Sequence, residues 1–308
     1  MKAKSTEGAL GRGPLGEGWL LESSRKEQTM IRKVNVIYKG RDTLEGAGVR
    51  LKRVFGYYEV PLFDPFLMLD DFGSHDPQDY IAGFPWHPHR GIETVTYMLH
   101  GTVSHGDSMG NKGKISDGQV QWMTAGSGII HQEMPQEQED YLRGFQLWVN
   151  LPAENKMMNP RYQDIQAKDI PEFRSEDGVK VRVIAGRYRG FAGPVKDIIC
   201  EPEYLDVHVP RGLTFEHPVK KGHAVFAYAI EGEGMVGPDR KNIQAGTLAL
   251  LGDGEKVVLE ANPSSFRFLL VSGKPIGEPV AWQGPIVMNT EEELTLAFKE
   301  YRTGTFIK

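Results

Sequence analysis

The segment TYMLHGTV (Thr96–Val103) recurs 131 positions later as AYAIEGEG (Ala227–Gly234). A second segment, GQVQWMTAGSGIIHQE from Gly118, matches GTLALLGDGEKVVLEA from Gly246 at an offset of 128. Two segments that keep their order and nearly their spacing indicate an internal duplication. Because any two β domains share glycine-bounded apolar runs, the duplication is a hypothesis that needs further support.

The sequence around these segments has the pattern of short β-strands. The 308 residues include 36 glycines and 19 prolines, which are typical turn residues. Short β-branched or aromatic runs bounded by such residues favour a sandwich or barrel over alternating strands and helices. The clearest runs are Val49–Phe55, Glu93–Leu99, Gln119–Met123 and Gly144–Val149, and a second β-rich stretch covers about residues 179–277. We therefore predict an all-β protein with two barrels in tandem.

The chain divides into a leader and two domains. Residues 1–29 are polar, glycine-rich and without periodicity, so we expect a mobile leader. Between residues 150 and 173 the composition shifts to Pro, Asn, Lys and Met, which places an N-terminal barrel at 30–165 and a C-terminal barrel at 166–308. A short helix is predicted near the end, where a Thr290–Glu293 capping box precedes apolar residues at helical spacing and Gly304 follows.

Composition excludes several classes of protein. With 40% apolar and 25% charged residues, the chain is typical of a soluble globular protein. A net charge of −5 disfavours direct nucleic-acid binding, and no apolar run approaches the ~20 residues that span a membrane. Cys200 is the only cysteine, which rules out an intramolecular disulfide and a cysteine-based zinc cluster and favours a reducing compartment.

Two short pairs of polar side chains indicate chemistry. His87 and His89 form an H-x-H pair, and His131 and Glu133 form an H-x-E pair. Residues i and i+2 of a strand point to the same face, about 6.5–7 Å apart, and such side chains can converge on one ion at about 2.0–2.2 Å. Three nitrogens and one carboxylate suit Fe, Mn, Ni, Cu or Zn rather than Mg or Ca. The pairs therefore predict one transition-metal site inside the first barrel.

An H-x-H pair can also be interpreted as two surface or turn histidines without a functional role. Pro88, which lies between the two histidines, favours an edge strand or a bulge. The duplication supplies an internal control. Counted from the shared glycines, the four candidate ligands correspond in the second copy to Pro218, Lys220, Leu259 and Ala261. Because the scaffold pattern persists without them, we interpret the four side chains as serving function rather than folding.

Longer motifs around these residues resemble the pirin family of two-barrel cupins. They are DPFLMLDDFG from Asp64, HPHRGIETVTY from His87, GQVQWMTAGSGIIHQEMP from Gly118 and GEPVAWQGPIVMNTEEE from Gly277. The resemblance covers about residues 34–305 and implies two cupin (jelly-roll) barrels. It also implies that the first barrel holds one metal, generally iron, through the two pairs described above, and that the second is free of metal.

The acidic ligand has a competing candidate. The wider cupin pattern takes its acid from a glutamate shortly after H-x-H, which here is Glu93. The pirin pattern uses the later acid instead. We therefore assign Glu133 as the ligand and expect Glu93 to have a supporting or structural role.

Bacterial pirins resemble quercetin 2,3-dioxygenases, which implies a metal-dependent dioxygenase that cleaves a flavonol with O2. The metal would acidify the substrate hydroxyl, and Glu133 would act as the catalytic general base. Eukaryotic pirins imply the alternative, an iron-dependent, redox-sensing transcriptional co-regulator that binds a protein partner without turnover. A third alternative is an oxygenase with a substrate that is not a flavonoid.

The expected cofactor is one divalent transition metal, with Fe(II) first and Mn, Ni, Cu and Zn as alternatives. No GxGxxG motif or P-loop indicates a nicotinamide or flavin. The expected partners are a small aromatic substrate and O2, without nucleic acid or membrane. We expect a monomer in the cytoplasm, or also in the nucleus if the source is eukaryotic.

Other residues are given structural interpretations. Six histidines lack a same-face partner at strand spacing and are interpreted mostly as loop or rim residues, although His105 is a candidate for a hydrogen bond near the site mouth. Trp86, Trp122 and Met123 are expected in the core or pocket wall, and Cys200 as a small buried hydrophobe. Arg90 is expected to orient an anion or to pair with an acid of the Asp70–Asp71 pair. The six histidines are His75, His100, His105, His208, His217 and His223.

Overall fold

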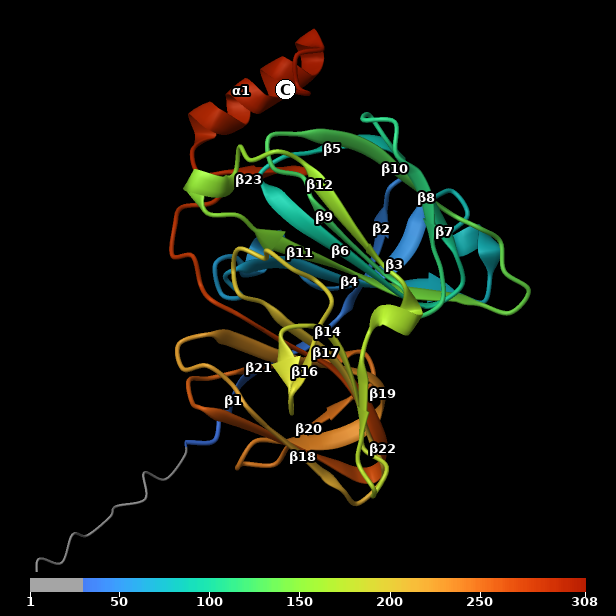
Figure 1. The fold of residues 1–308 in the computed structure, drawn as a ribbon, viewed down its shortest axis with the longest axis vertical. Helices are drawn as coiled ribbons and strands as arrows, with labels where there is room; N and C mark the ends of the chain where they lie inside the picture. The colour runs from blue at the N-terminus through green and yellow to red at the C-terminus, as the bar shows by residue number, and fades with distance from the viewer. Residues whose placement is uncertain (1–29) are drawn as a thin grey trace, which may run out of the picture.

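The computed structural model describes residues 30–308 as two β-barrels packed against each other, with a helix at the far end of the first barrel (Figure 1). The predicted mobile leader, residues 1–29, lies outside the described residues. The predicted all-β fold with a short C-terminal helix is confirmed. In the described part of the chain, α1 (Glu291–Thr303) is the only α-helix, and no helix is long and apolar enough to cross a membrane.

The first barrel consists of a seven-stranded antiparallel sheet and a four-stranded antiparallel sheet. The strand order is β12-β9-β6-β11-β4-β3-β2 in the larger sheet and β5-β10-β7-β8 in the smaller. The bounds are β2 (Arg41–Glu45), β3 (Val49–Phe55), β4 (Phe66–Ser74), β5 (Phe84–His89), β6 (Ile92–His100), β7 (Val103–Asp107), β8 (Lys112–Ile115), β9 (Val120–Thr124), β10 (Ile129–Pro135), β11 (Leu142–Asn150) and β12 (Arg161–Ile165).

The second barrel is one nine-stranded sheet that closes through two long strands. Residues 256–260 of β22 pair with β18, whereas residues 266–272 pair with β17, so one strand contributes to both walls. The bounds are β1 (Val34–Lys39), β13 (Glu172–Arg174), β14 (Lys180–Ala185), β17 (Glu203–Val209), β18 (Thr214–Pro218), β19 (Ala224–Val236), β20 (Lys241–Gln244), β21 (Thr247–Leu251) and β22 (Lys256–Gly273).

Shorter elements connect and cover the barrels. Two small hairpins are β15 (Arg187–Tyr188) with β16 (Phe191–Ala192), and β23 (Ala281–Gln283) with β24 (Ile286–Met288). Short 3₁₀ turns are η1 (Tyr57–Glu59), η2 (Pro77–Asp79), η3 (Ala153–Asn155) and η4 (Ala167–Asp169). The stretch between residues 150 and 173, where the composition shifts, contains β12 at the edge of the larger sheet.

Both ends of the described chain cross the predicted division at residues 165 and 166. Strand β1 lies within the range given to the N-terminal barrel, but it pairs along its length with β21 of the second barrel. In the other direction, the segment after β22 returns to the first barrel, where β24 bridges to Arg90. Strand pairing at the two ends therefore depends on residues that are far apart in the sequence, which a local pattern does not reveal.

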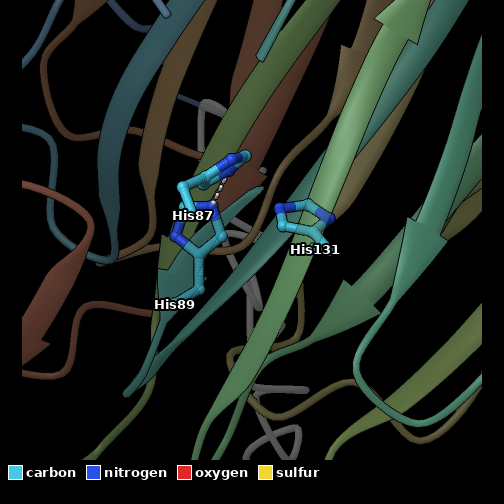
Figure 2. A group of neighbouring side chains, drawn as sticks. All are labelled: His87, His89 and His131. Atoms are coloured by element: carbon cyan, nitrogen blue, oxygen red, sulfur yellow. Dashed lines mark hydrogen bonds between the residues drawn. The ribbon is translucent and has the colours of Figure 1, made fainter. Parts of the chain in front are cut away.

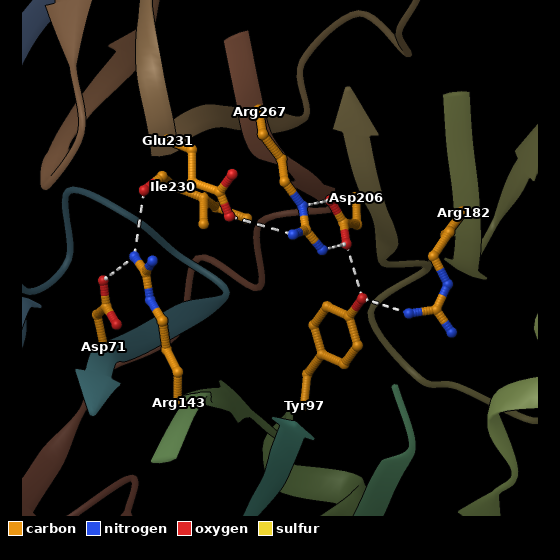
Figure 3. A network of polar contacts seen from close by, with 8 residues as sticks. All are labelled: Asp71, Tyr97, Arg143, Arg182, Asp206, Ile230, Glu231 and Arg267. Atoms are coloured by element: carbon orange, nitrogen blue, oxygen red, sulfur yellow. Dashed lines mark hydrogen bonds and ion pairs between the residues drawn. The ribbon is translucent and has the colours of Figure 1, made fainter. Parts of the chain in front are cut away.

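A shared apolar core holds the barrels together. It is built from outward faces of both large sheets, including Trp122 and Phe145 of the first barrel and Phe226 and Tyr228 of the second. Polar residues surround this core. The Tyr97 hydroxyl donates to Asp206 at 2.7 Å and accepts from Arg182 at 2.7 Å, while Arg267 pairs with both oxygens of Asp206 (Figure 3). Tyr97 belongs to the first barrel, whereas Arg182, Asp206 and Arg267 belong to the second, so the network fixes the relative orientation of the barrels.

The C-terminal helix forms as its sequence predicts. The Thr290 hydroxyl accepts from the Glu293 backbone N–H at 3.2 Å, and the Glu293 carboxylate accepts from the Thr290 N–H at 3.1 Å. Leu294 and Ala297 are buried against the hairpin of β23 and β24. Gly304 ends the helix in the left-handed region, with φ of 73°. The predicted capping box and stop are confirmed, and the apolar face is confirmed at Leu294 and Ala297, whereas Tyr301 is 38% exposed.

Candidate metal centre

The smaller sheet of the first barrel brings three imidazoles together. In the antiparallel pair of β5 and β10, His131 lies directly opposite His87, and His89 lies opposite Ile129. One ring nitrogen from each of the three histidines lies within 4.8 Å of the others (Figure 2). Strand β5 is an edge strand, as the proline between its histidines indicated. The H-x-H pair and the first member of the H-x-E pair therefore meet.

Backbone carbonyls fix the orientation of two of these rings. His87 Nδ1 lies 2.8 Å from the Pro85 carbonyl oxygen, and His89 Nδ1 lies 3.0 Å from the Pro285 carbonyl oxygen. Because a carbonyl only accepts, each Nδ1 carries the proton and each Nε2 presents a lone pair. The two Nε2 atoms are 3.0 Å apart. Two lone pairs at that distance repel unless a cation lies between them.

The donor set fits a transition-metal ion. Two nitrogens bound to one ion at about 2.1 Å and at right angles would lie about 3.0 Å apart, which matches the two Nε2 atoms. His131 is buried, and neither of its ring nitrogens has a hydrogen-bond partner among residues 30–308. An unpaired polar group in a protein interior is costly and calls for an explanation, such as an ion. Coordination would satisfy one of the two His131 ring nitrogens.

Burial keeps these imidazoles neutral and thus ready to bind. It lowers the pKa of His87 and, because the rings also lie close together, lowers the pKa values of His89 and His131 well below the usual value of 6.5. A protonated imidazole has no lone pair for a metal. At neutral pH the three rings therefore need lose no proton before binding a cation.

Glu133 lies on the same inward face of β10 as His131, two residues further along. Burial raises its pKa to about 7, and a hydrogen bond from Thr96 partly offsets that rise. The Thr96 hydroxyl is 3.2 Å from Glu133 Oε1 and 2.6 Å from Gln146 Oε1. Glu133 is not one of the three residues whose ligand atoms cluster within 4.8 Å. Its role as the fourth ligand therefore remains a prediction.

Glu93, the competing acid, faces a different part of the molecule. The residues between H-x-H and Glu93 form a turn at Arg90–Gly91, so Glu93 belongs to β6 rather than β5. It is fully buried and accepts a 2.6 Å hydrogen bond from Thr124. Its neighbour Val95, two residues along the same face, belongs to the core between the barrels. This position suits the structural role that we assigned to it.

A cavity of about 740 Å³ opens beside the imidazoles. His87, His89 and Glu133 line it, so any ion held there would be accessible to a small molecule. Its other walls are largely apolar or aromatic, with a few polar groups that include the ion pair between Arg53 and Asp70. The main wall residues are Leu51, Tyr57, Met68, Phe72, Phe84, Val103, Trp148 and Trp282.

Several predictions about surrounding residues need correction. Of the aromatic residues expected in the core or pocket wall, Trp122 lies in the core between the barrels, but Trp86 is 52% exposed; neither lines the cavity. Arg90 pairs with Glu300 at 2.7 Å, not with the Asp70–Asp71 pair. Those two acids instead pair with Arg53 and Arg143. Sequence neighbours around the ligands were therefore poor guides to the cavity wall.

His105, which we expected to form a hydrogen bond near the site mouth, lies on an inner wall. It is 7% exposed and stands directly opposite Glu133 in the pairing of β10 with β7. Its ring stacks on Tyr162 with centroids 5.6 Å apart, and its Nδ1 has no hydrogen-bond partner. His105 and Asp107 form an H-x-D pair on one strand. That spacing was a signal that the sequence offered and that we did not use.

In the second barrel, strand register assigns different residues to two of the four ligand positions than counting along the sequence did. Strand β18 pairs with β22 as β5 pairs with β10, and this register places Phe215 opposite Leu259 and His217 opposite Val257. The counterparts of His87 and His89 are thus Phe215 and His217, not Pro218 and Lys220. The count failed because residues 219–223 connect β18 to β19, where only residues 90–91 connect β5 to β6.

His217 is therefore an imidazole retained at a ligand position of the second barrel. It is buried, and its Nε2 lies 2.8 Å from the Glu203 carboxylate. The positions of the other three ligands are apolar. Within residues 30–308, His87, His89 and His131 form the only group of three potential ligands close enough to share an ion.

Two jelly-roll barrels in tandem, with inward-facing histidines on neighbouring strands of one of them, define a two-barrel cupin. The family comparison agrees with that class. The pirin family model matches residues 48–149, and the model of the pirin C-terminal cupin domain matches residues 204–307. The chain belongs to the pirin family.

Individual relatives span nearly the whole chain. A pirin-like protein of Caulobacter vibrioides is 47% identical over 277 residues, covering 90% of this chain and 99% of that protein. Human pirin is 41% identical over 277 residues, covering 89% and 93%. A crystal structure of quercetin 2,3-dioxygenase from Acinetobacter baumannii superposes with a TM-score of 0.84 at 34% identity, covering 90% of this chain and 99% of that one.

Proposed function

We propose that this protein is a metal-dependent dioxygenase that cleaves a flavonol-type ring with O2 in its first barrel. The observation that carries the proposal is the cluster of three neutral imidazoles opening onto a cavity of about 740 Å³. The likeness to the crystal structure of the quercetin 2,3-dioxygenase from Acinetobacter baumannii supports this choice of reaction.

The cavity walls suit a flat aromatic substrate. Trp148 packs edge-on against His89 with ring centroids 5.1 Å apart, and Trp282 lies 5.8 Å from Trp148. These contacting rings form an aromatic wall of the cavity, against which a polyphenol would pack with exclusion of water. The amide of Gln146 and the Arg53–Asp70 ion pair are the polar groups that would recognise its hydroxyls.

The proposed ligands are His87, His89, His131 and Glu133. A divalent transition metal held there would supply Lewis acidity toward a chelating hydroxyl and carbonyl and an open position for O2. Glu133 would accept the proton of the substrate hydroxyl, because it lines the cavity beside His87 and His89. The Thr96 hydroxyl, 3.2 Å from Oε1 of Glu133, would help to orient its carboxylate.

The decisive experiment combines metal-loaded protein with quercetin under air. We expect O2 uptake and loss of the flavonol in equal amounts, with carbon monoxide released as the heterocycle opens. The His131→Ala variant should show neither, while the control His208→Ala, a substitution in the second barrel, should retain both. No turnover with Fe, Mn, Ni or Cu would contradict the proposal and favour the co-regulator or another substrate.

We also propose Fe(II) as the native metal, on the strength of the family resemblance alone. The donor set accepts several divalent ions, and their order of affinity does not identify the one acquired in a cell. Elemental analysis of protein purified without added metal tests the assignment. Iron at about one equivalent per chain would support it, and nickel, manganese, copper or zinc in that amount would replace it.

A further inference from the structure

The last segment of the chain, residues 274–308, reaches the candidate metal centre after leaving the second barrel, and we call it the tail. The hairpin of β23 and β24 and helix α1 both lie in it and cover one end of the first barrel (Figure 1). Trp282 to Pro285 line the cavity beside the imidazoles. The tail therefore contributes directly to the wall of a site whose proposed ligands all belong to the first barrel.

One contact links the tail to a proposed ligand. The Pro285 carbonyl accepts from His89 Nδ1 at 3.0 Å, which places the His89 proton on Nδ1 and its lone pair on Nε2. The corresponding carbonyl for His87 is Pro85, only two residues away. The orientation of His89 thus depends on a residue 196 positions later, whereas that of His87 is set locally.

The strand that carries His89 holds the tail in register. Val287 N–H donates to the Arg90 carbonyl at 3.1 Å, and Arg90 forms a parallel bridge with Ile286. The fit leaves no free space, because a Cβ on Gly91 would lie 1.9 Å from the Val287 carbonyl oxygen. The Lys156 ammonium group donates to both Gly91 and Val287 carbonyls, at 2.9 and 3.1 Å. The turn after His89 and the tail are therefore one packed unit.

The Arg90 side chain anchors the far end of the tail. It is 2% exposed and donates to the Glu300 carboxylate and the Phe306 carbonyl, each at 2.7 Å. A third bond, at 2.6 Å, goes to the Ser127 carbonyl in the turn before β10. Its guanidinium also lies 4.2 Å from the centre of the Phe306 ring. One buried cation thus joins the tail to the turns that flank both ligand-bearing strands.

We propose that the tail is the outer coordination sphere of the metal centre, with Arg90 and Glu300 as positioning residues that hold the Pro285 carbonyl against His89. The inference rests on the proposed metal site but not on the identity of the substrate. Because the tail orients a ligand, metal binding and tail docking stabilise each other by the same factor. Loss of the contacts between Arg90 and the tail therefore lowers metal affinity, and metal binding slows hydrogen exchange in the tail.

The test uses full-length protein and Co(II), which reports its ligands through its visible absorption. Loss of a hydrogen bond that orients a ligating histidine typically costs about 10–100-fold in metal affinity. We expect Arg90→Met to reach that range and Glu300→Gln, which retains a neutral acceptor, to lose less. Glu292→Gln removes the same charge from an exposed position on α1 and should leave the affinity unchanged.

Two readouts separate positioning from general stability. Long-range proton–nitrogen NMR of the metal-free protein should show His89 protonated on Nδ1 in the wild type and a mixture of tautomers in Arg90→Met. Hydrogen exchange of amides 284–306 should slow when Co(II) binds to the wild type.

Folded Arg90→Met and Glu300→Gln variants with wild-type affinity would overturn the inference, as would tail exchange that Co(II) does not change. Failure of the wild type to bind Co(II) would overturn the proposed metal site together with the inference. Metal affinity that falls in Arg90→Met and Glu300→Gln, in a protein that does not turn over quercetin, would support the inference and reject only the proposed reaction.

Discussion

The two barrels share a strand plan but differ on their inward faces. The first barrel has His87 opposite His131 and encloses a cavity, whereas the second has Phe215 opposite Leu259 within a closely packed apolar cluster. His217 is retained at the counterpart of His89, but it pairs with Glu203. The comparison teaches that the shared strand plan does not require the inward histidines, because the second barrel folds around apolar side chains at those positions. Inward polar residues are therefore the part of the first barrel that folding does not explain.

The largest expected contrast comes from one substitution in each barrel. His131→Ala should lower Co(II) affinity by more than about 100-fold, beyond the loss typical of an outer hydrogen bond. Leu259→Ala, at the matching position, should lower the free energy of unfolding by about 2–5 kcal/mol by leaving a cavity, with metal affinity unchanged. Metal titration and urea unfolding of both variants measure the two effects. A Leu259→Ala protein that loses metal would show that metal binding does not depend on the first barrel alone.

The second contrast separates the two acids of the first barrel. Glu133→Ala should lose the metal, while Glu93→Ala should keep most of it. Glu93→Ala should instead lower stability by about 1–3 kcal/mol, because the Thr124 hydroxyl loses its buried acceptor. Metal content after dialysis and thermal unfolding distinguish the two variants. The reverse ranking in metal content would assign the acidic ligand to Glu93.

The third prediction concerns pH and applies only to the first barrel, since Ala261 stands where Glu133 would be. With the pKa of Glu133 near 7 and those of the three histidines below 6.5, metal affinity should fall about tenfold per pH unit below 7 and level off above it. Competition titrations between pH 5.5 and 8 measure the slope. Glu133→Gln should remove this slope, and a slope that persists would assign the proton to another group.

The same raised pKa has an opposite effect on the metal-free fold. Folded Glu133 retains a proton that the unfolded chain releases near pH 4.5, so its contribution to stability is greatest below that pH and declines as the pH rises to about 7. Urea unfolding of metal-free wild type and Glu133→Gln across this range checks the sign. The difference in stability between the two proteins should change in favour of Glu133→Gln as the pH rises.

The smallest expected effect is at the contact between the barrels. Tyr97→Phe removes a hydroxyl that bonds to Asp206 and Arg182 (Figure 3), while Arg267 still pairs with Asp206. We expect a loss of about 1–2 kcal/mol and unchanged metal affinity. Calorimetry should show a single transition in both proteins because the barrels share a core. Two separated transitions would show that the barrels unfold independently.

Local patterns in the sequence predicted much of the fold and the three clustered histidines of the site, but not the wall of its cavity. Glycine-bounded runs gave strands such as β3 with its observed bounds, and spacing by two residues placed His87 and His89 together. These succeeded because strand alternation and helix caps depend on neighbouring residues. The cavity wall did not follow, because Trp148 and Trp282 come from distant segments. The counterparts of His87 and His89 in the second barrel were misassigned, because counting from the shared glycine assumed that the connectors before β6 and β19 have the same length.

Strand β1 has a consequence for synthesis of the chain. Its partner β21 begins at Thr247, more than two hundred residues later, so at about 5–20 residues per second β1 waits on the order of tens of seconds for its partner to leave the ribosome. Meanwhile the first barrel is also without the hairpin of β23 and β24, which follows β22. Each barrel therefore depends on strands that are translated long after its first ones. Slow translation or truncation late in the message would expose unpaired strand edges in both, and aggregation would follow from either half.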